Sequence, residues 1–151
     1  MKQLTVLLAA AVSMMAADLS SVKTIYVLRM SNSLDQFLAL RLAHDQGLRV
    51  VTDPQKADAI FTDRLGGNFE RQMKNLYTPP SKTQGKLGED DQQTAVMQPL
   101  SHVNGSVFLV DRASREVLWS LYLKPKGRSS DDMNHLAQKI VDELDKSRKA
   151  K

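Results

Sequence analysis

The sequence predicts an α/β (α+β) fold: a two-layer sandwich in which a mixed β-sheet carries its helices mainly on one face. Residues 106–123 place two apolar runs around a short polar segment, the pattern of a β-hairpin. Residues 133–144 repeat apolar side chains at helical spacing. Upstream, short β-branched runs alternate with helical patterns. The predicted order of elements is β-α-β-β-α-loop-β-β-α.

The first half of the chain supplies three strands and a helix. Residues 23–30 form a β-branched and aromatic run that is apolar on both faces, which predicts a strand inside the sheet. Ser33 and Gln36 have the spacing of a capping box and predict the start of a helix that ends before Gly47. Residues 48–52 and 57–63 are two further short strands.

A short helix and a long connection follow. We expect Asn68 to cap the helix, and Pro79-Pro80 to end it. Its inward-facing residues are predicted to be Phe69, Met73, Leu76 and Tyr77. Residues 78–105 are rich in polar residues, Pro and Gly, which predicts a flexible insertion with a short strand at residues 94–97.

The hairpin and the last helix predict the core. Alternation along the second hairpin strand predicts one buried face formed by Val117, Trp119, Leu121 and Leu123. Ser129 or Ser130 is expected to cap the last helix. The apolar stripe of that helix comprises Met133, Leu136, Ala137, Ile140, Val141 and Leu144.

Composition narrows the possible functions. The chain has 151 residues and a formal net charge of +4, with acids and bases mixed along most of its length. It has no cysteine, which excludes disulfides, thiolate chemistry and a lipid anchor on cysteine. Basic residues cluster at the C-terminus, where they complement a helix dipole; an alternative is contact with nucleic acid or an anionic surface.

Residues 1–17 have the order of a signal peptide. Lys2 precedes an apolar run that ends in Ala16-Ala17, before the first acid, Asp18. The run is too short to span a bilayer comfortably, since a membrane helix needs about 20 apolar residues. We therefore expect a periplasmic or secreted protein with one α/β domain at residues 18–151. A buried N-terminal element of a cytoplasmic protein is the alternative.

The candidate site residues are two Asp-Arg pairs that end apolar runs. Asp63-Arg64 follows AIFT and Asp111-Arg112 follows VFLV. If the strands are neighbours, the four charges can form one cluster on the surface. The alternative is structural, with each aspartate bonding the backbone of a turn and each arginine covering a strand end. A catalytic carboxylate pair is also possible, although no spacing enforces it.

Other chemistries have little support. His44, His102 and His135 lack the spacing of metal ligands, and Gly66-Gly67 lacks the spacing of a dinucleotide loop. The serines do not occur in the motifs of nucleophilic serines. Few aromatic residues are interleaved with basic ones, so nucleic-acid binding is not favoured. We expect no metal and no cofactor.

Three segments resemble a class of small bacterial envelope domains. TIYVL with LRVVTDPQKADAIFTDRL, VFLVDRASREVLWS and LAQKIVDEL are similar to segments of the N-terminal domain of the Tol-system propeller protein, the penicillin-binding-protein activators and the curli-secretion lipoprotein. The lipoprotein members carry an acceptor cysteine that is missing here. The resemblance implies a domain that binds other envelope proteins without catalysis, and it transfers no site residues.

These observations lead to one expected function and two alternatives. We expect a non-enzymatic exported protein-interaction module of the bacterial envelope, with its partner another envelope protein and its surface near Asp63, Arg64, Asp111 and Arg112. The alternatives are a small exported hydrolase that uses carboxylates and a binder of nucleic acid or anionic surfaces through the C-terminal tail. The sequence leaves the oligomeric state open.

Overall fold

A computed structural model describes residues 18–44, 47–77 and 104–150. The strands are β1 (Thr24–Val27), β2 (Arg49–Val50), β3 (Ala59–Thr62), β4 (Ser106–Asp111) and β5 (Val117–Tyr122). The helices are α1 (Leu34–Ala43), α2 (Gly67–Tyr77) and α4 (Ser130–Lys149). The described strands and helices follow one another in the predicted order, β-α-β-β-α and then β-β-α. The predicted insertion at 78–105, its strand at 94–97 and the predicted signal peptide fall almost entirely outside the described residues.

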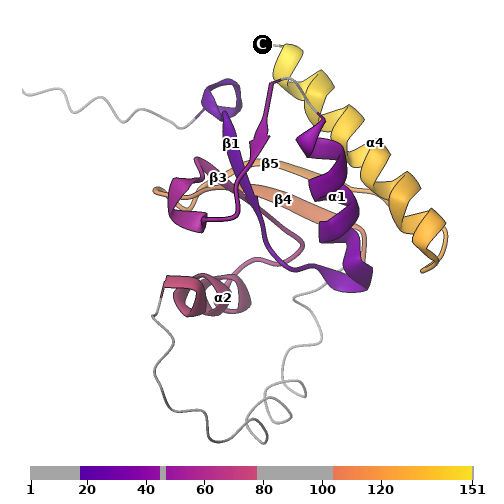
Figure 1. Cartoon of the computed structure of the whole chain (residues 1–151), viewed down its shortest axis with the longest axis horizontal. Coiled ribbons are helices and arrows are strands. Elements are labelled where there is room, and N and C mark those ends of the chain that lie inside the picture. Colours follow the sequence, from indigo (N-terminus) through magenta and orange to yellow (C-terminus); the bar gives the residue numbers. More distant parts are fainter. Residues whose placement is uncertain (1–17, 45–46, 78–103, 151) are drawn as a thin grey trace, which may run out of the picture.

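The five strands form one mixed sheet in the order β2-β1-β3-β4-β5 (Figure 1). β1 pairs in parallel with both β2 and β3, whereas β3-β4 and β4-β5 are antiparallel. β1 is an interior strand, as the apolar character of both its faces predicts, and β3 is interior as well. β5 forms one edge of the sheet.

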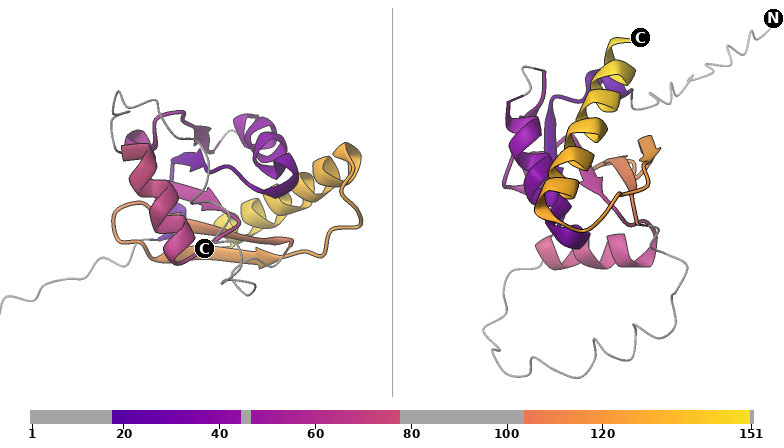
Figure 2. Two further views of the ribbon diagram at one scale, coloured as in Figure 1. Left: turned by 90° about the horizontal axis from the view of Figure 1, so that it is seen from below. Right: turned by 90° about the vertical axis from the view of Figure 1, so that its right-hand side faces the viewer.

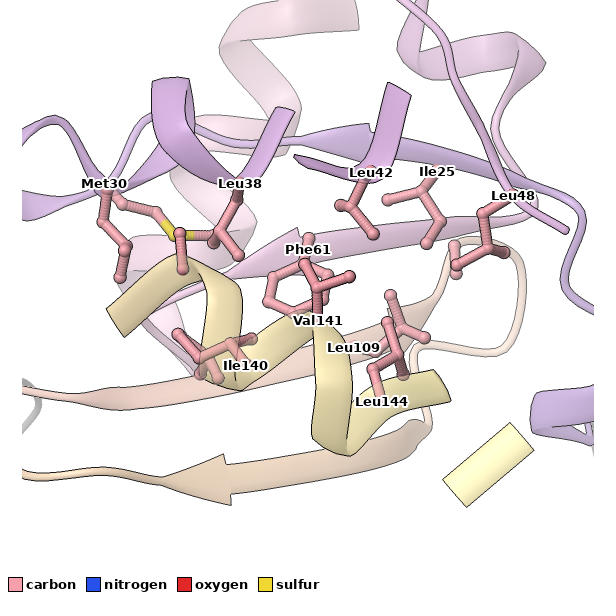
Figure 3. Packing of buried hydrophobic residues seen from close by; sticks show 14 of the residues in the cluster. Ile25, Met30, Leu38, Leu42, Leu48, Phe61, Leu109, Ile140, Val141 and Leu144 are labelled. Atoms are coloured by element: carbon pink, nitrogen blue, oxygen red, sulfur yellow. The ribbon is translucent and has the colours of Figure 1, made fainter. Parts of the chain in front are cut away.

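Helices α1 and α4 cover one face of the sheet, and α2 lies against the other (Figure 2). The larger core therefore lies between the sheet and the α1-α4 pair. Figure 3 shows side chains of α1 and α4 converging on Phe61 of β3 and Leu109 of β4. All six residues of the predicted α4 stripe are buried, which confirms that prediction.

Helix α4 begins as expected. The Ser129 hydroxyl accepts the N–H of Asp132, and the Asp132 carboxylate accepts the N–H of Ser129, which completes a capping box. At α1 the predicted capping box is wrong. Ser33 has a left-handed φ of 59° and makes no capping hydrogen bond; instead the Asp35 carboxylate accepts the N–H of Met30. The backbone of the loop before α1 is thus bonded by the carboxylate of Asp35, which lies in the first turn of the helix.

Strand β5 departs from the predicted alternation because it contains a bulge. Val110 pairs with Val117, yet Leu109 pairs with Trp119, so Leu118 is the extra residue. Val117 consequently lies on the α2 side and is 46% exposed, while Leu118 packs against the α1-α4 core. The prediction that Val117 is a core residue is wrong. Trp119 and Leu121 do pack on the core as expected.

Trp119 also fastens β5 to α4. Its indole N–H donates to the Ser147 hydroxyl at 3.0 Å, and its ring lies 6.2 Å from that of Phe61 at an interplanar angle of 56°. On the other face, Phe69 and Met73 of α2 are buried as predicted, but Leu76 is 41% exposed. Leu76 lies in the last turn of α2, next to the end of that helix.

The first prediction concerns Phe61, which is 0% exposed at the centre of the larger core. Phe61→Ala should lower the free energy of unfolding by about 3–5 kcal/mol, because it leaves a cavity among residues of β4, β5 and both helices. Leu40→Ala is the matched control, since Leu40 is 62% exposed and its truncation should change stability by less than about 0.5 kcal/mol. Urea unfolding followed by tryptophan fluorescence measures both. Equal effects of the two substitutions would contradict the proposed core.

Candidate functional site

The two predicted Asp-Arg pairs lie at opposite ends of the β3-β4 ladder. Ala59 pairs with Asp111 and Thr62 pairs with Phe108, so Asp63 lies past the far end of the segment that Asp111 closes. Four residues of strand separate the two positions by roughly 13 Å. The strands are neighbours, but they run in opposite directions. The expected single cluster of four charges is therefore wrong, and the two carboxylates do not form a close catalytic pair.

Asp111 and Arg112 organise the hairpin turn. The Asp111 carboxylate accepts the N–H groups of Ala113 and Ser114 at 3.0 and 2.7 Å. The Arg112 guanidinium donates to the carbonyl oxygen of Ala57 at 2.7 Å. Next in the turn, Arg115 lies over the ring of Phe69 at 5.7 Å. These contacts match the structural alternative, in which aspartate bonds a turn and arginine covers a strand end.

Asp63 and Arg64 lie where the carboxyl ends of parallel β1 and β3 meet. Open α/β sheets often bind ligands at such a point, where the chain crosses to opposite sides of the first strand. Here Asp63 is 5% exposed, accepts the N–H of Ser31 at 2.9 Å and has an oxygen 3.4 Å from the Arg64 guanidinium. The neighbouring space is about 20 Å³, room for about one water molecule. The space beside the Asp63-Arg64 pair is therefore too small for a ligand much larger than a water molecule.

Asp58, which the sequence analysis did not single out, joins three segments. Its carboxylate accepts the N–H groups of Lys23 and Thr24, each at 2.9 Å. Burial raises the pKa of Asp58, but the backbone bonds to Lys23 and Thr24, the Thr24 side chain and the charge of Arg112 together hold that pKa below its ordinary value of 3.8. The alanine-aspartate step at Ala57-Asp58 was the available signal, because it begins a strand that lies beside β1.

Strand β5 is an edge strand that carries two large exposed side chains. β5 pairs with β4 on one side only. Tyr122 and Val117 are 57% and 46% exposed, on the same sheet face as their pairing partners Ser106 and Val110. An unpaired strand edge that carries large exposed apolar side chains is a template on which another chain can pair.

A basic groove continues from the end of β5. It has a volume of about 210 Å³ and lies between the β5-α4 connection and the first half of α4. Its charged or titratable lining residues are Lys124, Lys126, Asp132, His135 and Lys139. The single acid among them is the one that caps α4. The groove thus presents three ammonium groups next to an exposed strand edge.

The basic C-terminal tail is largely engaged within its own helix. Lys146 donates to the Glu143 carboxylate at 2.6 Å, and this hydrogen bond and the charge of Glu143 raise the pKa of Lys146. Lys149 pairs with Asp145, and Arg148 donates to the carbonyl oxygen of Gly47. Along the described part of α4 these cations alternate with acids, so they do not form a surface of one sign.

Neither a membrane-spanning helix nor a metal-binding cluster occurs among the described residues. In residues 18–44, 47–77 and 104–150, no helix is long and apolar enough to cross a membrane. The described part of the chain also lacks any group of three or more histidine, aspartate and glutamate side chains placed to hold a metal ion. No family model, curated protein or solved structure matches this chain.

If Asp63 is structural, its removal should destabilise the fold. Asp63→Ala leaves the N–H of Ser31 without its carboxylate acceptor and should lower the free energy of unfolding by about 1–3 kcal/mol. Thermal or urea unfolding measures this change. An Asp63→Ala protein that is as stable as the wild type, yet loses a binding partner, would instead assign Asp63 to an interaction surface.

Asp58 should give the stability a dependence on pH. Because the folded-state pKa is depressed, its contribution is complete above about pH 3.8 and is lost as the pH falls through the folded-state pKa. Asp58→Asn should therefore cost about 1 kcal/mol at neutral pH, a figure limited by solvent screening, and progressively less below pH 3.8. Urea midpoints across this range measure the effect, with Glu116→Gln as the control. A deficit that stays constant with pH would contradict the role of the charge.

Proposed function

We propose that this chain is an exported protein-interaction module of the bacterial envelope that acts by binding and not by catalysis. Its docking surface is the edge of β5 together with the basic groove that continues from it. In this proposal residues 1–17 direct export, and the mature chain begins near Asp18. The partner is another envelope protein that contributes an extended segment.

The open edge of β5 carries the proposal. A strand with an unpaired edge offers backbone donors and acceptors to an incoming segment, and that addition is a common mode of peptide recognition. Tyr122 provides an exposed aromatic contact, a residue type enriched in protein interfaces. We therefore propose β5 as the surface that contacts the partner, in place of the Asp-Arg pairs expected from the sequence, because those pairs bond to the chain's own backbone.

The groove indicates the chemistry of the partner segment. Lys124, Lys126 and Lys139 favour acidic side chains, since each brings a positive charge to a concave surface. We therefore infer an extended segment with apolar residues along the strand and acidic residues beside the groove. Binding should weaken as salt is raised, because exposed charges are screened.

Site-specific photocrosslinking tests the proposal in cells. A photoreactive amino acid at Tyr122 should yield a discrete adduct with one envelope protein, which mass spectrometry identifies. The same probe at Leu40, an exposed residue of α1, should not. A synthetic peptide from the crosslinked region should then bind the purified protein, and Lys124→Glu with Lys126→Glu should weaken that binding at least about tenfold.

Two results would contradict the proposal. One is an uncleaved chain in the cytoplasm after cell fractionation and N-terminal sequencing. The other is an identical set of adducts from the probes at Tyr122 and Leu40, since β5 would then contribute no specificity.

A further inference from the structure

We propose that the β5 edge pairs with β5 of a second copy of this chain, in antiparallel fashion and about a two-fold axis near Leu121. This inference rests on the proposed function, because the same edge receives the partner segment. In the absence of a partner, the second copy then covers the docking surface, and the dimer must dissociate before a partner can bind.

The hydrogen bonding between β4 and β5 identifies which backbone groups face outward. The N–H of Leu123 donates to the carbonyl oxygen of Gly105 at 3.0 Å, so Leu123 bonds toward β4. Residues of an antiparallel strand alternate between its two neighbours. Leu121 therefore also bonds toward β4, whereas the N–H and C=O groups of Ser120 and Tyr122 point to the open edge.

The length of regular strand sets the position of the axis. The bulge at Leu118 interrupts the ladder on one side, and Pro125, which has no N–H, limits it on the other. The regular segment runs from residue 119 to residue 123, and its midpoint is Leu121. Two copies centred there place Ser120 of each copy opposite Tyr122 of the other. The outward N–H groups of these four residues then donate to the outward C=O groups of the residues opposite them.

The exposed side chains suit this register. Ser120 and Tyr122 pair with Phe108 and Ser106 on β4 and share the face of the sheet that those residues occupy. Opposite residues in an antiparallel pair project to the same face. Each Tyr122 ring, now 57% exposed, thus lies over the small Ser120 of the second copy, where it loses exposed apolar area without a clash of two large side chains.

Charge complementarity favours a second copy as the occupant. Glu116 precedes β5, and its carboxylate meets the Ser114 hydroxyl at 3.5 Å. Antiparallel pairing about Leu121 brings Glu116 to the segment of the second copy that holds Lys124 and Lys126, at the mouth of the basic groove. Each copy thus carries one carboxylate, that of Glu116, at one end of β5 and the lysines of the groove at the other, and the two-fold axis uses each of them twice.

A pairing limited to one edge should be weak. Stable interfaces usually bury about 1,200–2,000 Å² in total, more than a single added strand with its flanking side chains is expected to bury. We therefore expect a monomer-dimer equilibrium that depends on concentration, which an envelope partner with more acidic contacts can displace. Such competition makes the edge available only when the partner is present.

Disulfide trapping tests the register, since the chain has no cysteine. Ser120→Cys and Tyr122→Cys proteins are mixed under mild oxidation. Opposite residues of a hydrogen-bonded antiparallel pair have Cα atoms about 5.5 Å apart, within the about 4.4–6.8 Å that a disulfide spans. This mixture should form a disulfide-linked mixed dimer faster than a mixture of Ser114→Cys with Tyr122→Cys. Equal rates would overturn the register.

Two sets of variants test the association by sedimentation velocity over a roughly hundredfold range of concentration. Ser120→Pro removes an outward N–H and no bond to β4, so it should raise the dimer dissociation constant at least about tenfold. Ser120→Ala keeps the N–H and should dimerise as the wild type does. Equal melting temperatures of these two variants establish that Ser120→Pro has folded.

Charge reversal provides the second set and does not depend on a proline. Glu116→Lys and Lys126→Glu should each weaken the dimer, and the double variant should recover most of the loss. Losses that add in the double variant would overturn the charge pairing. A protein that is monomeric at every concentration, and gives no trapped dimer, refutes the second copy. The proposed function then still stands if Tyr122 crosslinks to an envelope protein, and falls if it does not.

Discussion

The change of strand direction between β3 and β4 is the constraint on which the rest of the structure depends. All four residues of β3 are buried, and β3 lies between parallel β1 and antiparallel β4. A strand buried on both faces must have cover on both, which α1 and α4 provide on one side and α2 on the other. β4 pairs antiparallel with β3, and a hairpin connects β4 to β5. β5 therefore pairs only with β4 and lies at the edge of the sheet.

The same constraint separates structural charges from surface available for binding. Antiparallel pairing sends Asp63 and Asp111 to opposite ends of the ladder, where each carboxylate accepts backbone N–H groups. Charges used in this way contribute to the fold and leave little for an external ligand. Among the described strands, the two edge strands β2 and β5 each have an outer side without a pairing strand, and β5, with six residues against two, offers the longer edge. The proposed interaction surface therefore rests on the topology of the sheet more than on the polar motifs.

Much of the fold was predictable from local patterns, since each element carries its own apolar period. The α4 stripe and its Ser129 cap are correct because helix period and capping are local properties. The bulge at Leu118 was not predictable, because it depends on the register with β4. The predicted cap of α1 was wrong because Ser33 takes a left-handed conformation that the sequence pattern does not indicate, and the Asp35 carboxylate bonds the preceding loop instead. Asp58 was missed because Lys23 and Thr24 come within reach of its carboxylate only after β1 and β3 pair.

Amide hydrogen exchange along β5 tests the central claim most directly, because it reads the two sides of the strand separately. In dilute protein the N–H groups of Ser120 and Tyr122 should exchange quickly, whereas that of Leu121 is protected by its bond to β4. At high concentration, or with a bound partner segment, Ser120 and Tyr122 should become protected while Leu121 changes little. Protection of Ser120 and Tyr122 equal to that of Leu121 in dilute protein would show that the edge is already covered and would contradict the account.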